Sequence, residues 1–232
     1  MLEPGPAQRV TIFVSENHRY HGRSAHEAVF EFLFYHHIAG ATVTRAVAGF
    51  GAHHQIHTGE ILAASASLPV KIEFIEAPAK VSEVLPKIRD MIGDGIIAMQ
   101  PTEVYFSGRA RAPAAPMAPR HDRLEGRGKL MRIYVREKDR WHGKPLHEAL
   151  VESLRAHDIA GVTVYRGIAG FGAERGGTEH EVPMMLSVVD TEERIQAYLP
   201  LLEEMLPHGL VALSDVEVIK YAHGGPGQEP RA

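Results

Sequence analysis

Apolar and polar positions along the chain follow one order of elements twice: strand, helix, strand, strand, helix, strand. Short β-rich runs with alternating apolar residues predict the strands, and apolar residues at helical spacing predict the helices between them. The predicted strands are 10–14, 42–47, 70–75 and 103–106 in the first half and 131–135, 162–168, 184–189 and 217–221 in the second.

Each half has two predicted amphipathic helices. Ser24 and Glu27 have the spacing of a capping box, and the first helix is expected to end before Gly40. In the second half, Pro145 suits a first helical turn, and that helix is expected to end before Gly161. The apolar stripes predicted to face the core are Ala25, Ala28, Val29, Phe32 and Leu33; Val81, Leu85, Ile88 and Ile92; Leu146, Ala149, Leu150 and Leu154; and Ile195, Leu199, Leu202 and Leu206.

The repeated order of elements is accompanied by repeated sequence. The segments IAGATVTRAVAGFGA and IAGVTVYRGIAGFGA lie 121 positions apart, as do ENHRYHG and EKDRWHG. Farther along, LPVKIEFIE and VPMMLSVVD lie 114 positions apart, so the second copy is seven residues shorter between Ala173 and Val182. This agreement indicates a tandem duplication with one deletion.

The order β-α-β-β-α-β is that of the ferredoxin-like arrangement, so the expected fold class is α+β with two tandem ferredoxin-like domains, 9–107 and 129–221. The segment 108–128 is rich in Pro, Ala and Arg and is expected to be a linker. The tail 222–232 is expected to be disordered. Because some strands are apolar on both faces, the uncovered sheet faces are expected to pack on other sheets.

Composition narrows the class of protein. The net charge of −4 gives no basic field for nucleic acid, and the absence of cysteine excludes disulfides and thiolate ligands. No apolar run approaches the ~20 residues of a membrane span, and the segment MLEPGPAQRV lacks the layout of a signal peptide. A cytoplasmic protein is the expectation. No catalytic motif is found, so an enzyme is not expected.

A histidine cluster in the first copy offers the main alternative chemistry. His53, His54 and His57 lie in GFGAHHQIHTGE, and neutral imidazoles bind divalent metals such as zinc, copper or nickel. Solvated surface histidines are the other reading of this segment. The second copy has no histidine at the corresponding positions of GFGAERGGTEHE.

Several motifs agree in order and spacing with a known family. GKPLHEAL and YRGIAGFG in the second copy and IHT in the first resemble those of the PII-like domain-of-unknown-function family numbered 190, within the PII superfamily of trimeric signalling proteins. The resemblance covers roughly 9–107 and 129–221. It implies a homotrimer of ~75 kDa, three times the 25.5 kDa chain. It also implies clefts between domains that bind adenine nucleotides, and a long loop that reports ligand state to another protein.

The function that this resemblance implies is that of a non-enzymatic sensor. It would bind a small anionic effector, with an adenine nucleotide as one candidate, and regulate an unidentified protein such as a membrane transporter or channel. The alternatives are a divalent-metal-binding protein that uses His53, His54 and His57, and a duplicate whose second copy only completes the assembly. PII proteins carry a lysine where this chain has Ile96 and Leu210. The positions that match the family's ligand cleft are Thr42, Gly49, Gly51, His57, Thr58, Gly93 and Gly95 in the first copy and Thr163, Gly170, Gly172 and Gly209 in the second.

Overall fold

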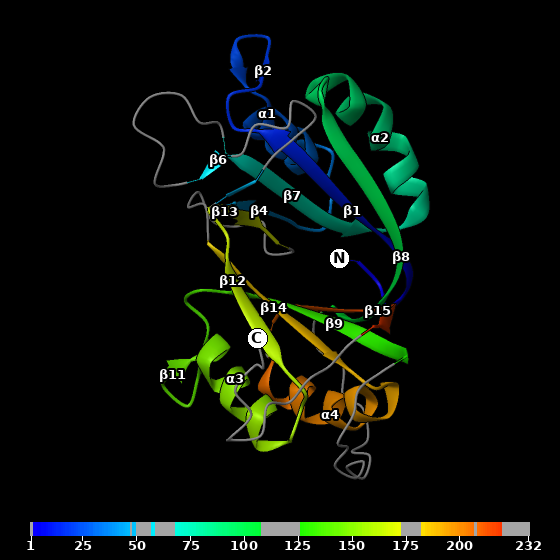
Figure 1. Cartoon of the computed structure of the whole chain (residues 1–232), viewed down its shortest axis with the longest axis vertical. Coiled ribbons are helices and arrows are strands. Elements are labelled where there is room, and N and C mark those ends of the chain that lie inside the picture. The colour runs from blue at the N-terminus through cyan, green and yellow to red at the C-terminus, as the bar shows by residue number, and fades with distance from the viewer. Residues whose placement is uncertain are drawn as a thin grey trace, which may run out of the picture.

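The computed structural model describes residues 2–46, 48–49, 57–58, 68–107, 126–172, 182–206 and 208–219. These residues form an α+β structure in which two outer pairs of helices enclose the strands (Figure 1). Most of the predicted linker and all of the predicted tail lie outside the described residues, as do Gly51, His53 and His54.

The elements follow the predicted order in both halves, with short additional strands. The first half contains β1 (Gly5–Ser15), β2 (Arg19–Tyr20), β3 (Arg23–Ser24), α1 (Ala25–Tyr35), β4 (Ala41–Arg45), β5 (Ala48–Gly49), β6 (His57–Thr58), β7 (Pro69–Glu76), α2 (Pro78–Ile92) and β8 (Gly95–Ser107). The second half contains β9 (Gly126–Arg136), β10 (Arg140–Trp141), β11 (Lys144–Pro145), α3 (Leu146–Ala156), β12 (Val162–Arg166), β13 (Ala169–Phe171), β14 (Pro183–Asp190), α4 (Glu192–Met205) and β15 (Leu210–Val218).

One continuous sheet joins the two halves. Its order is β12-β14-β9-β15-β8-β1-β7-β4-β13, so the four long strands of each half follow the order expected for a βαββαβ unit. The halves meet where β8 pairs with β15. Two separate ferredoxin-like domains, each with its own sheet, are therefore not confirmed. The reason lies in β8, which is thirteen residues long and pairs with β1 along one edge and with β15 along the other.

The two ends of this sheet are joined by the chain itself. Only Gly167 and Ile168 separate β12, at one end, from β13, at the other. The Gly167 amide donates to the carbonyl of Pro183 at 2.8 Å, and the Ile168 amide donates to the carbonyl of Val43 at 2.7 Å. The chain thus crosses from the second half to the first within two residues, and the sheet closes on itself.

The apolar side chains form two similar cores and one smaller cluster between them. Each large core fills the space between a helix pair and its own strands, with Ile12, Leu33 and Ile88 in the first half and Ile133, Leu150 and Leu199 in the second. The third cluster lies where the halves meet and contains Leu2, Ala7, Ile75, Val104 and Ala212. The sheet faces expected to pack on other chains thus contact one another within a single chain.

Three details of the predicted helices differ in the structure. Phe30 and Val84 are buried, whereas Ala28, Phe32 and Leu85 are half-buried. The other positions predicted for these two stripes are buried: Ala25, Val29, Leu33, Val81, Ile88 and Ile92. The predicted capping box is not formed: the Ser24 hydroxyl makes no cap bond and lies 2.7 Å from Nδ1 of His26.

The duplication is also visible in matched polar contacts. Arg45 pairs with Glu16 at 2.5 Å, and their counterparts Arg166 and Glu137 pair at 2.7 Å. At the ends of the third long strands, Glu76 accepts from the amides of Ala39 and Ala77, and Asp190 accepts from those of Ala160 and Thr191. These contacts fix the same strand-to-helix connections in both halves.

Candidate functional site

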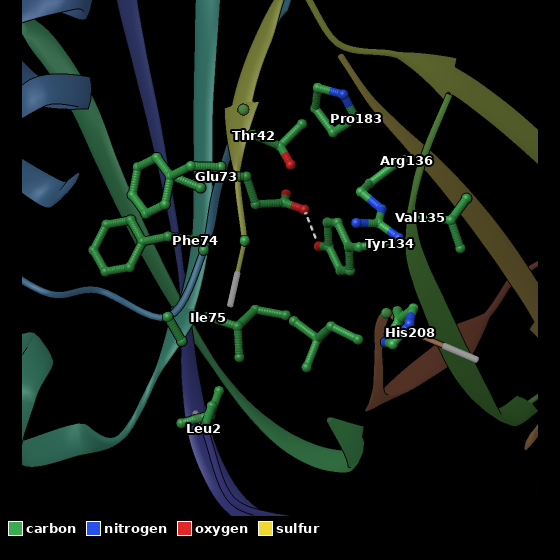
Figure 2. A pocket seen from close by; sticks show the side chains of 18 of the residues that line it. Leu2, Thr42, Glu73, Phe74, Ile75, Tyr134, Val135, Arg136, Pro183 and His208 are labelled. Atoms are coloured by element: carbon green, nitrogen blue, oxygen red, sulfur yellow. Dashed lines mark hydrogen bonds between the residues drawn. The ribbon is translucent and has the colours of Figure 1, made fainter. Parts of the chain in front are cut away.

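A pocket lies between the two halves (Figure 2). Thr42, Glu73 and Ile75 reach it from strands of the first half, and Tyr134 and Arg136 reach it from β9 of the second. Apolar groups of Leu2, Phe171 and Leu210 form much of the remaining wall. Four glycines also line the pocket: Gly40, Gly170, Gly172 and Gly209. A concave site with apolar walls and a few converging polar groups is the usual form of a small-molecule site.

Four of the residues expected in the ligand cleft meet in this pocket. Strand β13 pairs with β4 so that Gly170 lies opposite Thr42, and Gly172 follows immediately beyond the strand. Gly209, the counterpart of Gly95, also lines the pocket. The family positions that meet here thus come from both halves of the chain, one from the first and three from the second.

Thr163, Gly93 and Gly95, which the structure describes, are not in the wall of this pocket. Thr163 is exposed on β12, opposite Ser187. Gly93 is the C-cap of α2, with a φ of 47°, and Gly95 begins β8. In the short β5–β6 ladder, Gly49 pairs with His57 and Ala48 pairs with Thr58. Gly51, His53 and His54 lie outside the described residues.

Gly170 is held in a space too small for a side chain. A Cβ atom there would lie 2.5 Å and 2.8 Å from ring carbons of Pro183 and 3.1 Å from the carbonyl oxygen of Ala41. The close approach of β13 to both neighbours therefore requires glycine at this position.

Gly170→Ala is expected to destabilise the protein by about 1–3 kcal/mol, the usual cost of overpacking a tight site. Urea unfolding followed by circular dichroism measures this loss. Gly172→Ala is the matched control, because a Cβ atom at Gly172 would meet nothing within 4 Å. Equal stability of the two variants would show that β13 can move away from Pro183 without cost.

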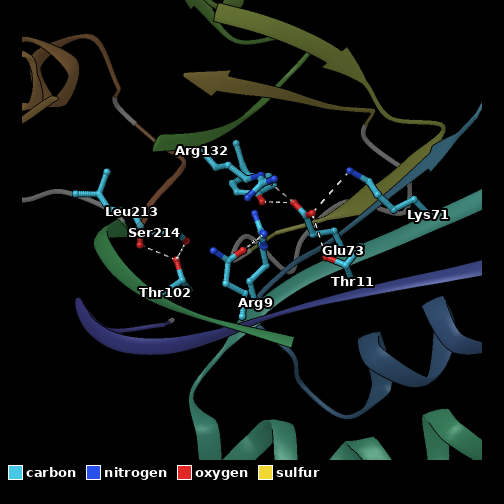
Figure 3. A network of polar contacts seen from close by, with 10 residues as sticks. Arg9, Thr11, Lys71, Glu73, Thr102, Arg132, Leu213 and Ser214 are labelled. Carbon is cyan, nitrogen blue, oxygen red and sulfur yellow. Dashed lines mark hydrogen bonds and ion pairs between the residues drawn. The ribbon is translucent and has the colours of Figure 1, made fainter. Parts of the chain in front are cut away.

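Glu73 is the centre of a polar network beside the pocket (Figure 3). Its side chain is 2% exposed, and it accepts a hydrogen bond from the Tyr134 hydroxyl at 2.5 Å. Thr11 donates to Glu73 at 3.4 Å, and the cationic groups of Lys71 and Arg132 lie 3.7 Å and 3.6 Å away. The carboxylate therefore links strands of both halves and is the buried counter-charge for two cations.

The Tyr134 hydroxyl is a poor acid in this setting. Burial raises its pKa well above the usual value of 10, and the adjacent Glu73 carboxylate adds to the rise, while the charge of Arg9 opposes it. Burial likewise raises the pKa of Tyr198 to about 12. Since the unfolded chain releases such a proton near pH 10 and the folded chain retains it, folding stability falls as the pH rises above 10.

Tyr134→Phe is expected to weaken this alkaline loss of stability, because the variant has no proton to retain at that position. The free energy of unfolding, measured in urea between about pH 8 and 11, should fall less steeply with pH than in the unmodified protein. Tyr35→Phe, at a side chain that is 71% exposed, is the control. Parallel pH profiles for Tyr134→Phe and the unmodified protein would contradict the assignment.

The polar residues of this region were not among those expected from the sequence. Glu73, Tyr134 and Arg132 belong to no motif, and they meet only because the halves pack together. One signal was present: Lys71 and Glu73 are charged residues inside the otherwise apolar run VKIEFI, on alternate positions of one strand. Charged side chains on one face of a buried strand indicate an internal polar site.

Metal binding and membrane insertion find no support in the described part of the chain. No group of three or more histidine or carboxylate side chains there is placed to hold a metal ion. Two of the three proposed metal ligands, His53 and His54, lie outside it. None of the described helices is long and apolar enough to cross a membrane.

Comparison with known proteins identifies relatives that match about two fifths of this chain. The chain is 34% identical over 102 residues to the UPF0166 protein MJ1524 of Methanocaldococcus jannaschii, a match covering 40% of this chain and 94% of that protein. It is 35% identical over 100 residues to a UPF0166 protein of Aquifex aeolicus, covering 39% of this chain and 92% of the relative. These relatives have the length of one half, in keeping with the duplication.

Among solved structures, the crystal structure of a protein designated chlorite dismutase TA0507 covers 90% of this chain and 93% of its own, with 9% identity and a TM-score of 0.28. A likeness this low carries no argument about function. The family model DUF190, described as "Uncharacterized ACR, COG1993", matches residues 7–104 and again 128–218. The predicted family and its tandem duplication are thus confirmed, and the chain belongs to the DUF190 family.

Proposed function

We propose that this protein is a non-catalytic sensor that binds a small anionic effector in the pocket between its two halves and regulates a partner protein. The observation that carries the proposal is the meeting of Thr42, Gly170 and Gly172 in one pocket at the junction of the halves. The resemblance to PII proteins implies ligand contacts at these three positions.

The chemistry of the pocket suits a ligand with a flat apolar part and a polar end, such as an adenine nucleotide. Ile75, Phe171 and Leu210 offer apolar contacts, and Thr42 and Arg136 offer polar ones. The side chain of Arg136 is already positioned by Asp139, with its Nε 2.8 Å from Oδ1. Preorganised polar groups of this kind lower the entropic cost of binding.

Titration calorimetry with ATP, ADP, AMP and cyclic AMP tests the proposal. Thr42→Val is expected to weaken binding of the responding nucleotide at least ~10-fold, the effect of losing about 1.4 kcal/mol of contact. The duplication supplies a matched control in Thr163→Val, since Thr163 is the counterpart of Thr42 and is exposed. The proposal fails if no nucleotide binds, or if both variants weaken binding equally.

Assembly as a homotrimer is part of the same proposal and is supported by the resemblance to PII proteins. The sheet faces that were expected to pack on other sheets contact one another within one chain, so they do not support a trimer. Light scattering coupled to size exclusion distinguishes a trimer of ~75 kDa from a 25.5 kDa monomer. Regulation of a partner protein is the remaining part of this proposal.

A further inference from the structure

Among the described residues, the polar network around Glu73 contains more cationic than anionic side chains. Arg9 and Lys71 enter it from the first half and Arg132 enters it from the second, and the carboxylate of Glu73 faces Lys71 and Arg132. Arg9 is hydrogen-bonded to the neutral side chain of Gln100. Buried charge without a counter-charge is costly, so a surplus of cations inside a protein requires an explanation.

The two guanidinium groups have donor capacity that the described residues leave unused. Nε and Nη1 of Arg9 and Nε of Arg132 are buried and have no hydrogen-bond partner. Arg132 is 16% exposed, and its Nε lies 3.6 Å from the carboxylate of Glu73, which is longer than a hydrogen bond. Figure 3 shows the side chains of Arg9 and Arg132 directed toward the same region beside Glu73.

The pocket and this cluster share Glu73. Glu73 and Tyr134 line the pocket, and Glu73 also contacts Arg132. A ligand in the pocket meets Arg136 in the pocket wall, and Arg132 lies beside Glu73, a residue of the same wall. Arginine presents its donors in a planar fork that matches the oxygens of phosphate and carboxylate groups.

We propose that Arg9 and Arg132 bind an oxyanion, such as a phosphate group, in the interior between the two halves. This deepens the proposed function, on which it rests, by naming the residues that hold the charged end of the effector. Each half contributes one arginine, so the site exists only when the halves are packed together. Glu73 offsets part of the positive charge while the site is empty.

Thermal unfolding in increasing concentrations of sodium phosphate and pyrophosphate, against sodium chloride at equal ionic strength, tests this inference. Ligands that bind only the folded state raise the midpoint in proportion to the logarithm of their concentration. The unmodified protein should show this rise with phosphate beyond that with chloride. Arg9→Met and Arg132→Met should each weaken apparent phosphate binding at least 10-fold.

A second readout separates ligand binding from a structural role. Without phosphate, Arg9→Met should be as stable as the unmodified protein or more stable, because it removes a charge whose Nε and Nη1 are buried and which no described carboxylate pairs with. Arg155→Met, at an exposed position near the end of α3, is the control and should leave the phosphate response unchanged. Loss of stability in Arg9→Met with an unchanged phosphate response would overturn the inference, as would the absence of any phosphate-specific rise.

The outcome is distinguishable from that of the proposed function. A phosphate response that depends on both arginines, without nucleotide binding, would support the oxyanion site and remove the nucleotide as effector. Nucleotide binding that depends on Thr42 but is unaffected by Arg9→Met would support the pocket and overturn the oxyanion site. Pyrophosphate binding as tight as that of a nucleotide would identify a free anion as the ligand of the arginines.

Discussion

Glu73→Gln is expected to lower the free energy of unfolding by about 3–5 kcal/mol, the cost of removing one member of a buried charge cluster. Glutamine preserves the size of the side chain and can still accept from the Tyr134 hydroxyl, so the change mainly removes the negative charge. Lys71 and Arg132 would then lie in the interior without the carboxylate that now faces them at 3.7 Å and 3.6 Å. Urea unfolding at neutral pH measures the loss.

Glu83→Gln is the matched control for this change. Glu83 pairs with Lys80 at 2.9 Å, but its side chain is 58% exposed, and exposed pairs contribute at most about 1 kcal/mol. The two substitutions alter the same chemical group in different surroundings. If both variants lost the same small amount, water would have to reach Glu73, and the interior cluster would not be a buried one.

Asp190→Ala is expected to cost about 3 kcal/mol, since each hydrogen bond to a charged group contributes roughly 1.5–3 kcal/mol. Asp190 is fully buried, and its two oxygens accept from the amides of Ala160 at 2.8 Å and Thr191 at 2.7 Å. Removing the carboxylate would leave both amides without their acceptor, at the start of α4 and at the entry to β12. Thermal or urea unfolding detects a loss of this size directly.

The control for Asp190 is another aspartate of the same half. Asp215 pairs with Lys129 at 2.6 Å, but its side chain is 88% exposed, so Asp215→Ala should change stability by less than about 1 kcal/mol. A further variant, Glu76→Ala, removes the counterpart carboxylate of the first half and should behave like Asp190→Ala. A small effect in both buried variants would mean that solvent replaces the lost acceptors.

The local elements of this fold were predictable because their signals are local. The apolar stripe at Leu146, Ala149, Leu150 and Leu154 is the buried face of α3, as its spacing predicts. The length of β8 was not predictable in the same way. Only the last residues of that strand were expected, whereas it begins at Gly95, because its length depends on pairing with β1 and β15 at once.

Only those residues of the candidate site that belong to a family motif were predictable from the sequence. Thr42 and Gly170 were expected through resemblance, and strand pairing places them opposite one another. Glu73 and Tyr134 lie 61 positions apart in different halves, and no periodicity in either strand encodes their contact. Packing between the halves decides which side chains meet there, and a single sequence carries no direct signal of that packing.

The residues of the Glu73 network differ between the two copies, and this difference offers a reason for the duplication. In the second copy, the position of Glu73 is Ser187 and that of Arg9 is Leu130; in the first copy, the positions of Tyr134 and Arg132 are Phe13 and Thr11. Two identical subunits meeting by a two-fold axis would carry each of these side chains twice, with like charges facing each other. Joining two copies in one polypeptide lets each position diverge alone, so that a single asymmetric charge cluster can form where symmetry would otherwise forbid it.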